Sequence, residues 1–186
     1  WWRDKRARCA EQWGLRAASS ALHRACMFDF RPAPDTPKPE AYRQLLDAAD
    51  ALSAGEPDAV ANMANIAALL WDFLPDLNWA GFYRVVDGEL VLGPFIGRPA
   101  CIRIPMGQGV CGVAASKGAT QLVEDVHAFP GHIACDAVTN SELVVPVKRD
   151  GKVIAVIDLD SPEKARFDKA DAAGIEAIAS MLAKRI

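Results

Sequence analysis

The stretch L-V-V-P-V-K-R-D-G-K-V-I-A-V-I-D-L-D, from Leu143 to Asp160, decides the fold of this chain. Two runs rich in β-branched residues flank the dipeptide Asp150-Gly151, which is typical of the tight turn of a β-hairpin. The stretch therefore predicts two antiparallel strands, over residues 143–148 and 152–160.

Apolar periodicity and turn residues predict further elements on both sides of this hairpin. They are helices over 40–54, 58–74, 109–116 and 168–186, strands over 79–86, 89–92, 102–105 and 120–124, and an irregular loop over 125–140. Asp168 is the predicted N-cap of the last helix. This order indicates an α+β fold. We expect the N- and C-terminal helices to cover one face of an antiparallel sheet, and loops to cover a pocket on the other face.

Length and composition indicate one globular domain. The chain has 186 residues, of which 51% are apolar and 24% are charged, an ordinary balance for a domain with its own core. Its net charge of −3 gives no reason to expect nucleic acid as a partner. No apolar run approaches the roughly 20 residues that span a membrane, and no secretory signal is visible. Five cysteines, an odd number, fit a reducing compartment, so we expect a cytoplasmic protein.

The N-terminal segment differs from the rest of the chain. Residues 1–26 are rich in arginine, and four prolines follow between Arg31 and Pro39. We predict an N-terminal extension over 1–38 and a single domain over 39–186. One interpretation is a native start at Met27, preceded by an overlong reading frame. The alternative is an organelle transit peptide.

Cys135 is the predicted nucleophile. It lies in the loop sequence F-P-G-H-I-A-C-D-A, residues 129–137, whose glycine and proline indicate a turn that leaves a thiol within reach. The thiolate is the reactive form of cysteine, and His132 would favour it whereas Asp136 would oppose it. A buried structural cysteine is the alternative.

Cys101 and Cys111 join Cys135 in a trio that points to thiol redox chemistry. Cys111 lies in the first turn of the predicted helix over 109–116, where the helix N-terminus would stabilise a thiolate. Packing among small residues is the alternative for Cys111. Cys101 ends the glycine- and proline-rich stretch 93–101, which we expect to be a mobile loop, as a resolving thiol requires.

A zinc site is the rival interpretation of the same thiols. The candidate ligands are Cys101, Cys111, His127, His132 and Cys135. None of these cysteines belongs to a C-x-x-C pair, so no metal site is predicted.

Two acids lie at the end of the strand over 152–160. Because alternate residues of a strand share a face, four side chains are expected to point the same way: Ile154, Val156, Asp158 and Asp160. Buried carboxylates are costly without partners. Asp158 and Asp160 therefore indicate either a pocket or, more simply for Asp160, a solvated strand end.

Glu142 joins these acids only if the hairpin turn has the right length. A two-residue Asp150-Gly151 turn pairs Glu142 with Leu159 and places it on the opposite face. A three-residue turn pairs Glu142 with Asp158. Three acids in one pocket would suit a substrate with an ammonium group, or would donate a hydrogen bond to a polar oxygen.

Trp79 and Tyr83 share one face of the strand over 79–86. They could line the same pocket and hold an apolar group. Core packing is an equally good explanation of the pattern.

Several motifs resemble those of the free methionine-(R)-sulfoxide reductases, a GAF-domain family. They are N-W-A-G-F-Y (78–83), L-V-L-G-P-F-I-G-R-P-A-C-I-R-I-P (90–105), G-Q-G-V-C-G-V-A-A (107–115), D-V-H-A-F-P-G-H-I-A-C-D (125–136), S-E-L-V-V-P-V (141–147) and D-L-D-S-P (158–162). The resemblance covers residues 40–186 and is specific, since ordinary GAF sensor domains lack the cysteine trio.

The resemblance implies the roles of the thiols. Cys135 would attack the sulfur of free methionine (R)-sulfoxide and become a sulfenic acid. Cys101 would resolve it as a disulfide that thioredoxin reduces, and Cys111 would be an auxiliary thiol or a pocket residue. No bound cofactor is required.

The resemblance also implies the substrate-binding residues. Glu142, Asp158 and Asp160 would hold and polarise the substrate, which demands the three-residue turn, and Trp79 would pack on the substrate methyl group. A GAF module that senses a small molecule without catalysis, or a zinc-stabilised domain, is the alternative. The oligomeric state is not set by the sequence, and a homodimer remains open.

Overall fold

The computed structural model describes residues 31–131 and 136–186. The predictions for residues 1–30, for His132 and for Cys135 lie outside the described residues. The helix α2 begins at Lys38, but the division into an extension and a domain stays a prediction. None of the described helices is long and apolar enough to cross a membrane.

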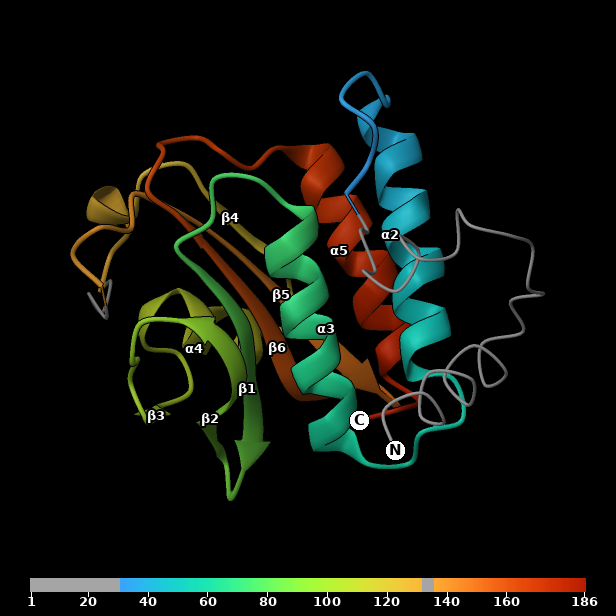
Figure 1. Ribbon diagram of the computed structural model, residues 1–186. Coiled ribbons are helices and arrows are strands. Elements are labelled where there is room, and N and C mark those ends of the chain that lie inside the picture. Colours follow the sequence, from blue (N-terminus) through green and yellow to red (C-terminus); the bar gives the residue numbers. More distant parts are fainter. Residues whose placement is uncertain (1–30, 132–135) are drawn as a thin grey trace, which may run out of the picture.

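The described strands form one antiparallel sheet in the order β3-β2-β1-β6-β5-β4 (Figure 1). The strands are β1 (Trp79–Val86), β2 (Glu89–Gly97), β3 (Arg103–Ile104), β4 (Gln121–Val123), β5 (Ser141–Arg149) and β6 (Lys152–Ser161). The helices are α2 (Lys38–Ser53), α3 (Ala59–Phe73), α4 (Gly109–Lys117) and α5 (Lys169–Leu182), with a short 3-10 helix at Val126–Ala128. The two hairpins meet at the β1–β6 pair, in the middle of the sheet.

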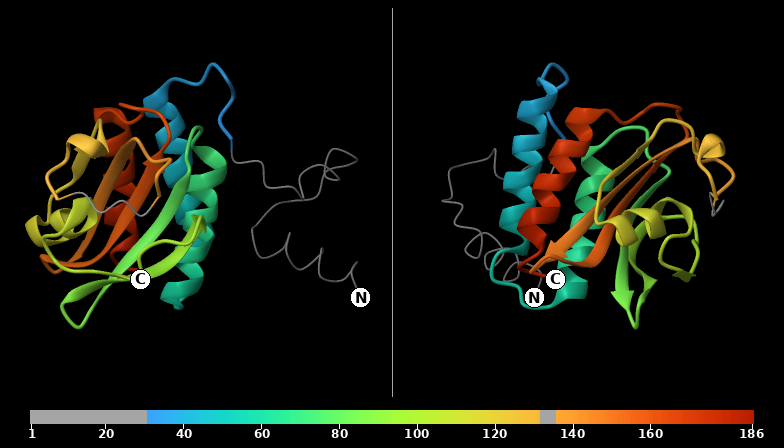
Figure 2. Two further views of the ribbon diagram at one scale, coloured as in Figure 1. Left: turned by 90° about the vertical axis from the view of Figure 1, so that its left-hand side faces the viewer. Right: turned by 180° about the vertical axis from the view of Figure 1, so that it is seen from behind.

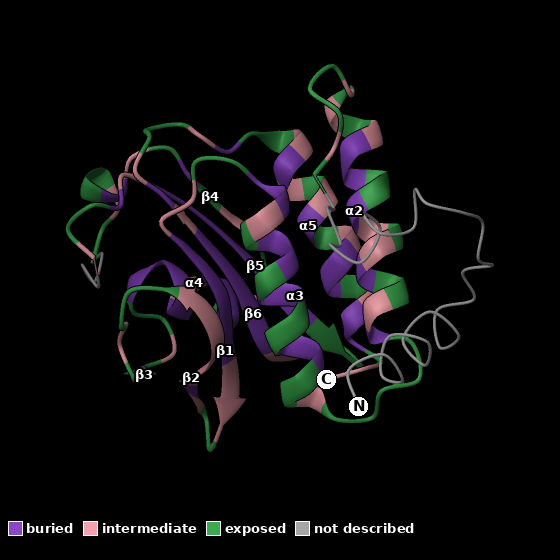
Figure 3. Cartoon of the chain, in the orientation of Figure 1, coloured by how far each residue is buried: buried purple, intermediate pink, exposed green. Residues whose placement is uncertain are grey.

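The helices divide between the two faces of the sheet (Figures 1 and 2). The helices α3 and α5 pack directly on one face, and α2 packs across both of them. The shorter helix α4 packs on the opposite face, against β5 and β6. Figure 3 shows the strands β5 and β6 buried between these layers. The predicted α+β architecture, with terminal helices on one face of an antiparallel sheet, is confirmed.

Alternation along the strands builds two separate cores. Leu143, Val145 and Ile157 belong to the core under α2, α3 and α5. Val144 and Val156, one residue further along, belong to the core under α4. The strands β1, β5 and β6 therefore contribute to both layers, as the period of two requires.

The strand β2 is longer than its sequence predicts. The stretch 93–101 was expected to be a mobile loop, and this prediction is wrong for its first half, because β2 continues to Gly97 and pairs with β1. The pairing tolerates Pro94 because the register shifts there, so that Gly93 and Pro94 together oppose Phe82 in a β-bulge.

The turn of the β5–β6 hairpin has two residues, Asp150 and Gly151, both with positive φ (52° and 77°). Arg149 pairs with Lys152 at the end of the ladder. The three-residue turn that the resemblance demands is therefore wrong.

A β-bulge in β6 shifts the register of the hairpin by one residue, which the two-residue turn does not do. Val147 pairs with Ala155, so that Ile154 is an extra residue in β6, and Glu142 comes to lie opposite Asp160. The bulge also turns Ile154 toward the helix-side core, while Val153 packs on the pocket side. Ile154 was expected to share a face with Asp158, and that expectation is wrong for the same reason.

The helices α2 and α5 pack closely together at Gly174. A Cβ atom added there would lie 2.1 Å from Cδ1 of Tyr42, a distance that real contacts do not reach. The hydroxyl of Tyr42 donates to Oδ1 of the buried Asp171 at 2.5 Å, which fixes the ring against α5. The ring therefore has little freedom to move away.

We expect Gly174→Ala to lower the free energy of unfolding by about 1–3 kcal/mol through overpacking, although alanine is normally the better helix residue. Denaturant unfolding measures the effect. Ser180→Ala, on the exposed face of the same helix, is the matched control and should change stability by less than about 0.5 kcal/mol. A more stable Gly174→Ala variant would contradict the close contact.

Candidate functional site

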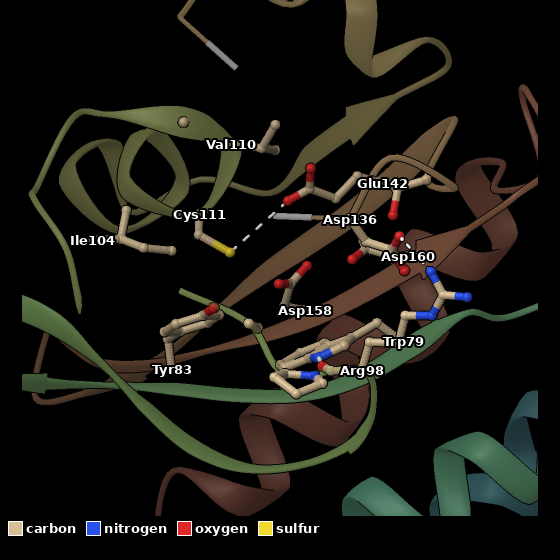
Figure 4. Close-up of a pocket in the computed structure, with 14 residues that line it drawn as sticks. Trp79, Tyr83, Arg98, Ile104, Val110, Cys111, Asp136, Glu142, Asp158 and Asp160 are labelled. Atoms are coloured by element: carbon tan, nitrogen blue, oxygen red, sulfur yellow. Dashed lines mark hydrogen bonds and ion pairs between the residues drawn. The ribbon is translucent and has the colours of Figure 1, made fainter. Parts of the chain in front are cut away.

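A small cavity of about 40 Å³ lies on the face of the sheet opposite α3 and α5, between β1, β6, β5 and the start of α4 (Figure 4). Six of the residues singled out from the sequence line it: Trp79, Tyr83, Cys111, Glu142, Asp158 and Asp160. The pocket predicted on this face therefore exists. Alternation along β1, β5 and β6 brings five of these side chains together, and α4 supplies Cys111.

Three carboxylates converge in this pocket. Glu142 lies opposite Asp160 across the β5–β6 ladder, and Asp158 lies opposite Val144, the next residue of the same face. Glu142 and Asp158 are only 7% and 6% exposed. Figure 4 shows the three side chains directed into one space. The β-bulge at Ile154 thus places Glu142 on the same face as Asp158 and Asp160, which the sequence analysis expected only from a three-residue turn.

Burial raises the pKa of all three acids. It raises the pKa of Asp158 to about 6. The pKa values of Glu142 and Asp160 rise well above their ordinary range, first by burial and then by repulsion from Asp158. Among the described residues, Oδ1 of Asp158 has no hydrogen-bond partner. Burial in the pocket therefore favours the protonated form of these acids, and Oδ1 of Asp158 is left available for a ligand.

Cys111 faces these acids from the first turn of α4. Its Sγ lies 3.9 Å from Oε1 of Glu142, within the range of a thiol hydrogen bond. Burial, and then the negative charge of Asp158 and Glu142, raise the pKa of the thiol. The expectation that the helix N-terminus makes Cys111 acidic is therefore wrong. The thiol stays protonated at neutral pH and donates toward the carboxylate.

Aromatic rings form the opposite wall of the pocket. The ring of Trp79 stacks on Phe95 at 5.2 Å and on Tyr83 at 5.9 Å between centroids. Nε1 of Trp79 donates to the carbonyl oxygen of Arg98 at 3.2 Å, and the Tyr83 hydroxyl donates to that of Cys101 at 3.0 Å. With their polar atoms occupied, the two rings present apolar surface to the pocket.

The other predicted thiols lie partly outside what the structure describes. Cys101 lies between β2 and β3, packs against the pocket-side core and is disulfide-bonded. Its partner, like Cys135, lies outside the described residues. Cys111 is a free thiol.

Comparison with known proteins identifies the family. The GAF domain model matches residues 60–186. The chain is 51% identical to Protein YtsP of Bacillus subtilis over 151 residues, which cover 80% of this chain and 93% of the relative. It is 48% identical to the free methionine-R-sulfoxide reductase of Escherichia coli over 147 residues, which cover 79% of this chain and 89% of the relative. The chain belongs to the GAF-domain family of free methionine-R-sulfoxide reductases.

A solved structure from the same family agrees with this assignment. The free methionine-R-sulfoxide reductase of Neisseria meningitidis, solved in complex with its substrate, is 46% identical and superposes with a TM-score of 0.79. The match covers 83% of this chain and 93% of that one. The family resemblance predicted from the motifs is thereby confirmed, and so is the GAF fold.

Sequence reasoning missed three polar residues of this GAF-domain pocket: Arg98, Asp136 and Thr139. Nδ2 of Asn78 donates to Oγ1 of Thr139 at 2.9 Å and to Oδ2 of Asp136 at 3.4 Å. Nη1 of Arg98 lies 3.5 Å from Oδ1 of Asp136. Arg98 and Asp136 belong to the motifs that resemble those of the family, and this membership was the sequence signal that could have indicated them. Thr139 carries none, because only the folded chain brings it beside β1.

The zinc ligands considered from the sequence are not gathered in the part of the GAF domain that the structure describes. Nε2 of His127 lies 3.2 Å from Oδ1 of Asn140, on the surface. The described residues instead bring Cys111 together with Glu142 and Asp158, with one ligand atom of each lying within 4.8 Å of the others.

We expect Asp158→Asn to raise the free energy of unfolding at pH 7 by about 3 kcal/mol, since the pKa is raised by roughly two units and each unit corresponds to about 1.4 kcal/mol. The folded protein holds a proton on Asp158 up to a pKa of about 6, whereas the unfolded chain releases it near pH 4. The stabilisation that the protonated Asp158 gives the wild type is therefore fully present below about pH 4 and is lost as the pH rises through about 6. The variant should lack this loss.

Denaturant unfolding between pH 4 and pH 7 measures the difference. Asp35→Asn, which makes the same substitution at an exposed carboxylate, is the matched control. A variant that is less stable than the wild type at pH 7 would show that the Asp158 carboxylate has a partner in the fold.

Proposed function

We propose that this protein reduces free methionine (R)-sulfoxide to methionine by thiol chemistry. The observation that carries the proposal is the buried cluster of Glu142, Asp158 and Asp160 facing the stacked rings of Trp79 and Tyr83. The identity of 48% to a relative named for this activity supports it.

The pocket suits both ends of a small sulfoxide amino acid. An ionised carboxylate of the cluster attracts the ammonium group, and a protonated one donates a hydrogen bond to the sulfoxide oxygen. The ring of Trp79, already stacked on Phe95, offers apolar surface to the methyl group. Three acids at the binding site select a substrate that carries a free amino group, which a methionine sulfoxide within a polypeptide lacks.

The proposed chemistry begins at Cys135. Its thiolate attacks the sulfoxide sulfur, and a protonated acid of the cluster transfers a proton to the sulfoxide oxygen. A sulfur–sulfur bond forms first. The protonated oxygen then passes from the substrate sulfur to Cys135 as the sulfur–oxygen and sulfur–sulfur bonds break, so that methionine leaves and Cys135 becomes a sulfenic acid. The substrate sulfur gains two electrons, and the cysteine sulfur loses two.

The proposed second half uses Cys101. Its thiol attacks the sulfenic acid, a disulfide with Cys135 forms, and the oxygen leaves as water. A dithiol reductant of the thioredoxin type restores both thiols by exchange. The bonded state of Cys101 and the free state of Cys111 support this division of roles. A reducing compartment such as the cytoplasm suits this cycle.

We expect Cys135→Ser to abolish turnover, because the proposed chemistry begins with the Cys135 thiolate. The measurement is consumption of the separate R and S epimers of free methionine sulfoxide with dithiothreitol, followed by chromatography. The wild type should consume the R epimer, and Cys111→Ser, which removes the protonated thiol, should retain activity. If the wild type consumes neither epimer, the pocket binds a small molecule without catalysis.

Substrate without reductant should produce one disulfide between Cys101 and Cys135, found by peptide mapping. Cys101→Ser should release one equivalent of methionine and then stop, since the sulfenic acid has lost its resolving partner. Cys111→Ser is the matched control and should still form the disulfide. A free Cys101 thiol in the oxidised wild-type protein would exclude its resolving role.

A further inference from the structure

Cys111, Glu142 and Asp158 come from three different elements and converge on one point. Ligand atoms of the three side chains, a sulfur and two carboxylate oxygens, all lie within 4.8 Å of one another. Sγ of Cys111 and Oε1 of Glu142 lie 3.9 Å apart. Ligands bound to one zinc ion at about 2.0–2.3 Å stand roughly 3.5 Å apart, so the three ligand atoms lie at most slightly more than 1 Å beyond the spacing that zinc requires.

A second observation indicates that this cluster is built to receive a ligand. Asp158 is 6% exposed, yet its Oδ1 accepts no hydrogen bond from any described residue. A buried carboxylate oxygen without a partner costs free energy in a folded protein. Figure 4 shows the Asp158 side chain pointing from β6 toward Cys111, into the space between the three ligands.

We propose that Cys111, Glu142 and Asp158 form a zinc-binding site in this pocket. A thiolate together with two carboxylates selects Zn²⁺ over Mg²⁺ or Ca²⁺, which prefer oxygen alone. Three protein ligands leave a fourth tetrahedral position open to water or another small ligand. The divalent charge offsets the mutual repulsion of the acids and replaces the proton of the Cys111 thiol, which is released on binding.

This site would make the protein sensitive to zinc. A bound ion occupies the space that the proposed function assigns to the sulfoxide, so Zn²⁺ should compete with the substrate. The competition rests on the proposed function, whereas metal binding does not, and the two are measured separately.

The test uses Co²⁺ as a spectroscopic probe of the full-length protein, kept reduced with a phosphine. A thiolate ligand gives Co²⁺ a charge-transfer absorption in the near ultraviolet. In the wild type this absorption should increase as Co²⁺ is added and should saturate at one equivalent of Co²⁺ per protein. Zn²⁺ should displace the Co²⁺, because it binds such ligands more tightly, and Mg²⁺ should not.

Variants assign the ligands. Cys111→Ser should abolish the band, and Asp158→Asn should weaken Co²⁺ binding by at least about tenfold. Cys135→Ser, Cys101→Ser and Asp35→Asn are the controls and should bind like the wild type. Circular dichroism checks that each variant is folded.

Three outcomes would overturn the site. They are no band in the wild type, a band that persists in Cys111→Ser, and displacement of Co²⁺ by Mg²⁺. If Zn²⁺ binds with these ligands but does not inhibit sulfoxide consumption, the metal site stands and the proposed substrate position fails.

Discussion

The register of the β5–β6 hairpin is the constraint on which the pocket depends. Directly opposed residues of two paired strands share a face, and a shift of one residue exchanges the two faces. With a regular two-residue turn, Glu142 would oppose Leu159, which packs in the core under the helices. The extra residue at Ile154 moves Glu142 opposite Asp160 instead. Because of this one β-bulge, the Glu142 carboxylate lies in the pocket. Without it, the same charge would be buried in the helix-side core.

Two buried aspartates show how the same residue type serves different purposes in this fold. Asp171 is fully buried and accepts hydrogen bonds from the Tyr42 hydroxyl, from Nζ of Lys38 and from the backbone N–H of Asp168, at 2.5–2.7 Å. Asp158 is buried on the other side of the sheet, and its Oδ1 has no such partner in the described structure. The satisfied carboxylate holds α2 against α5, whereas the unsatisfied one remains available for chemistry.

Local signals account for what the sequence predicted well. Asp168 caps α5 as expected, because its side chain needs only the N–H groups of the next turn. Ile175, Ile178 and Leu182 are fully buried, since helical periodicity alone decides which face they share. The aromatic and acidic residues of the pocket were likewise predicted from strand alternation together with family motifs.

Features that depend on distant partners could not be predicted in this way. Gly93 and Pro94 look like a loop until pairing with β1 supplies a bulge that accommodates the proline. The bulge at Ile154 leaves no mark in the sequence, which is why the turn was assigned the wrong length. The raised pKa of Cys111 arises first from burial and then from the charges of Asp158 and Glu142, far along the chain, and these outweigh the local effect of its helix. In each case tertiary contacts override a sound local expectation.

The two cores on opposite faces of one sheet have a consequence for evolution. The larger core is the helix-side layer, to which Leu143, Ile157 and Leu159 contribute, whereas the alternate positions of the same strands line the pocket. Substitutions at Glu142, Asp158 or Trp79 can therefore change what the pocket accepts without disturbing the helix layer. Such a division lets a lineage exchange one ligand chemistry for another while the scaffold persists.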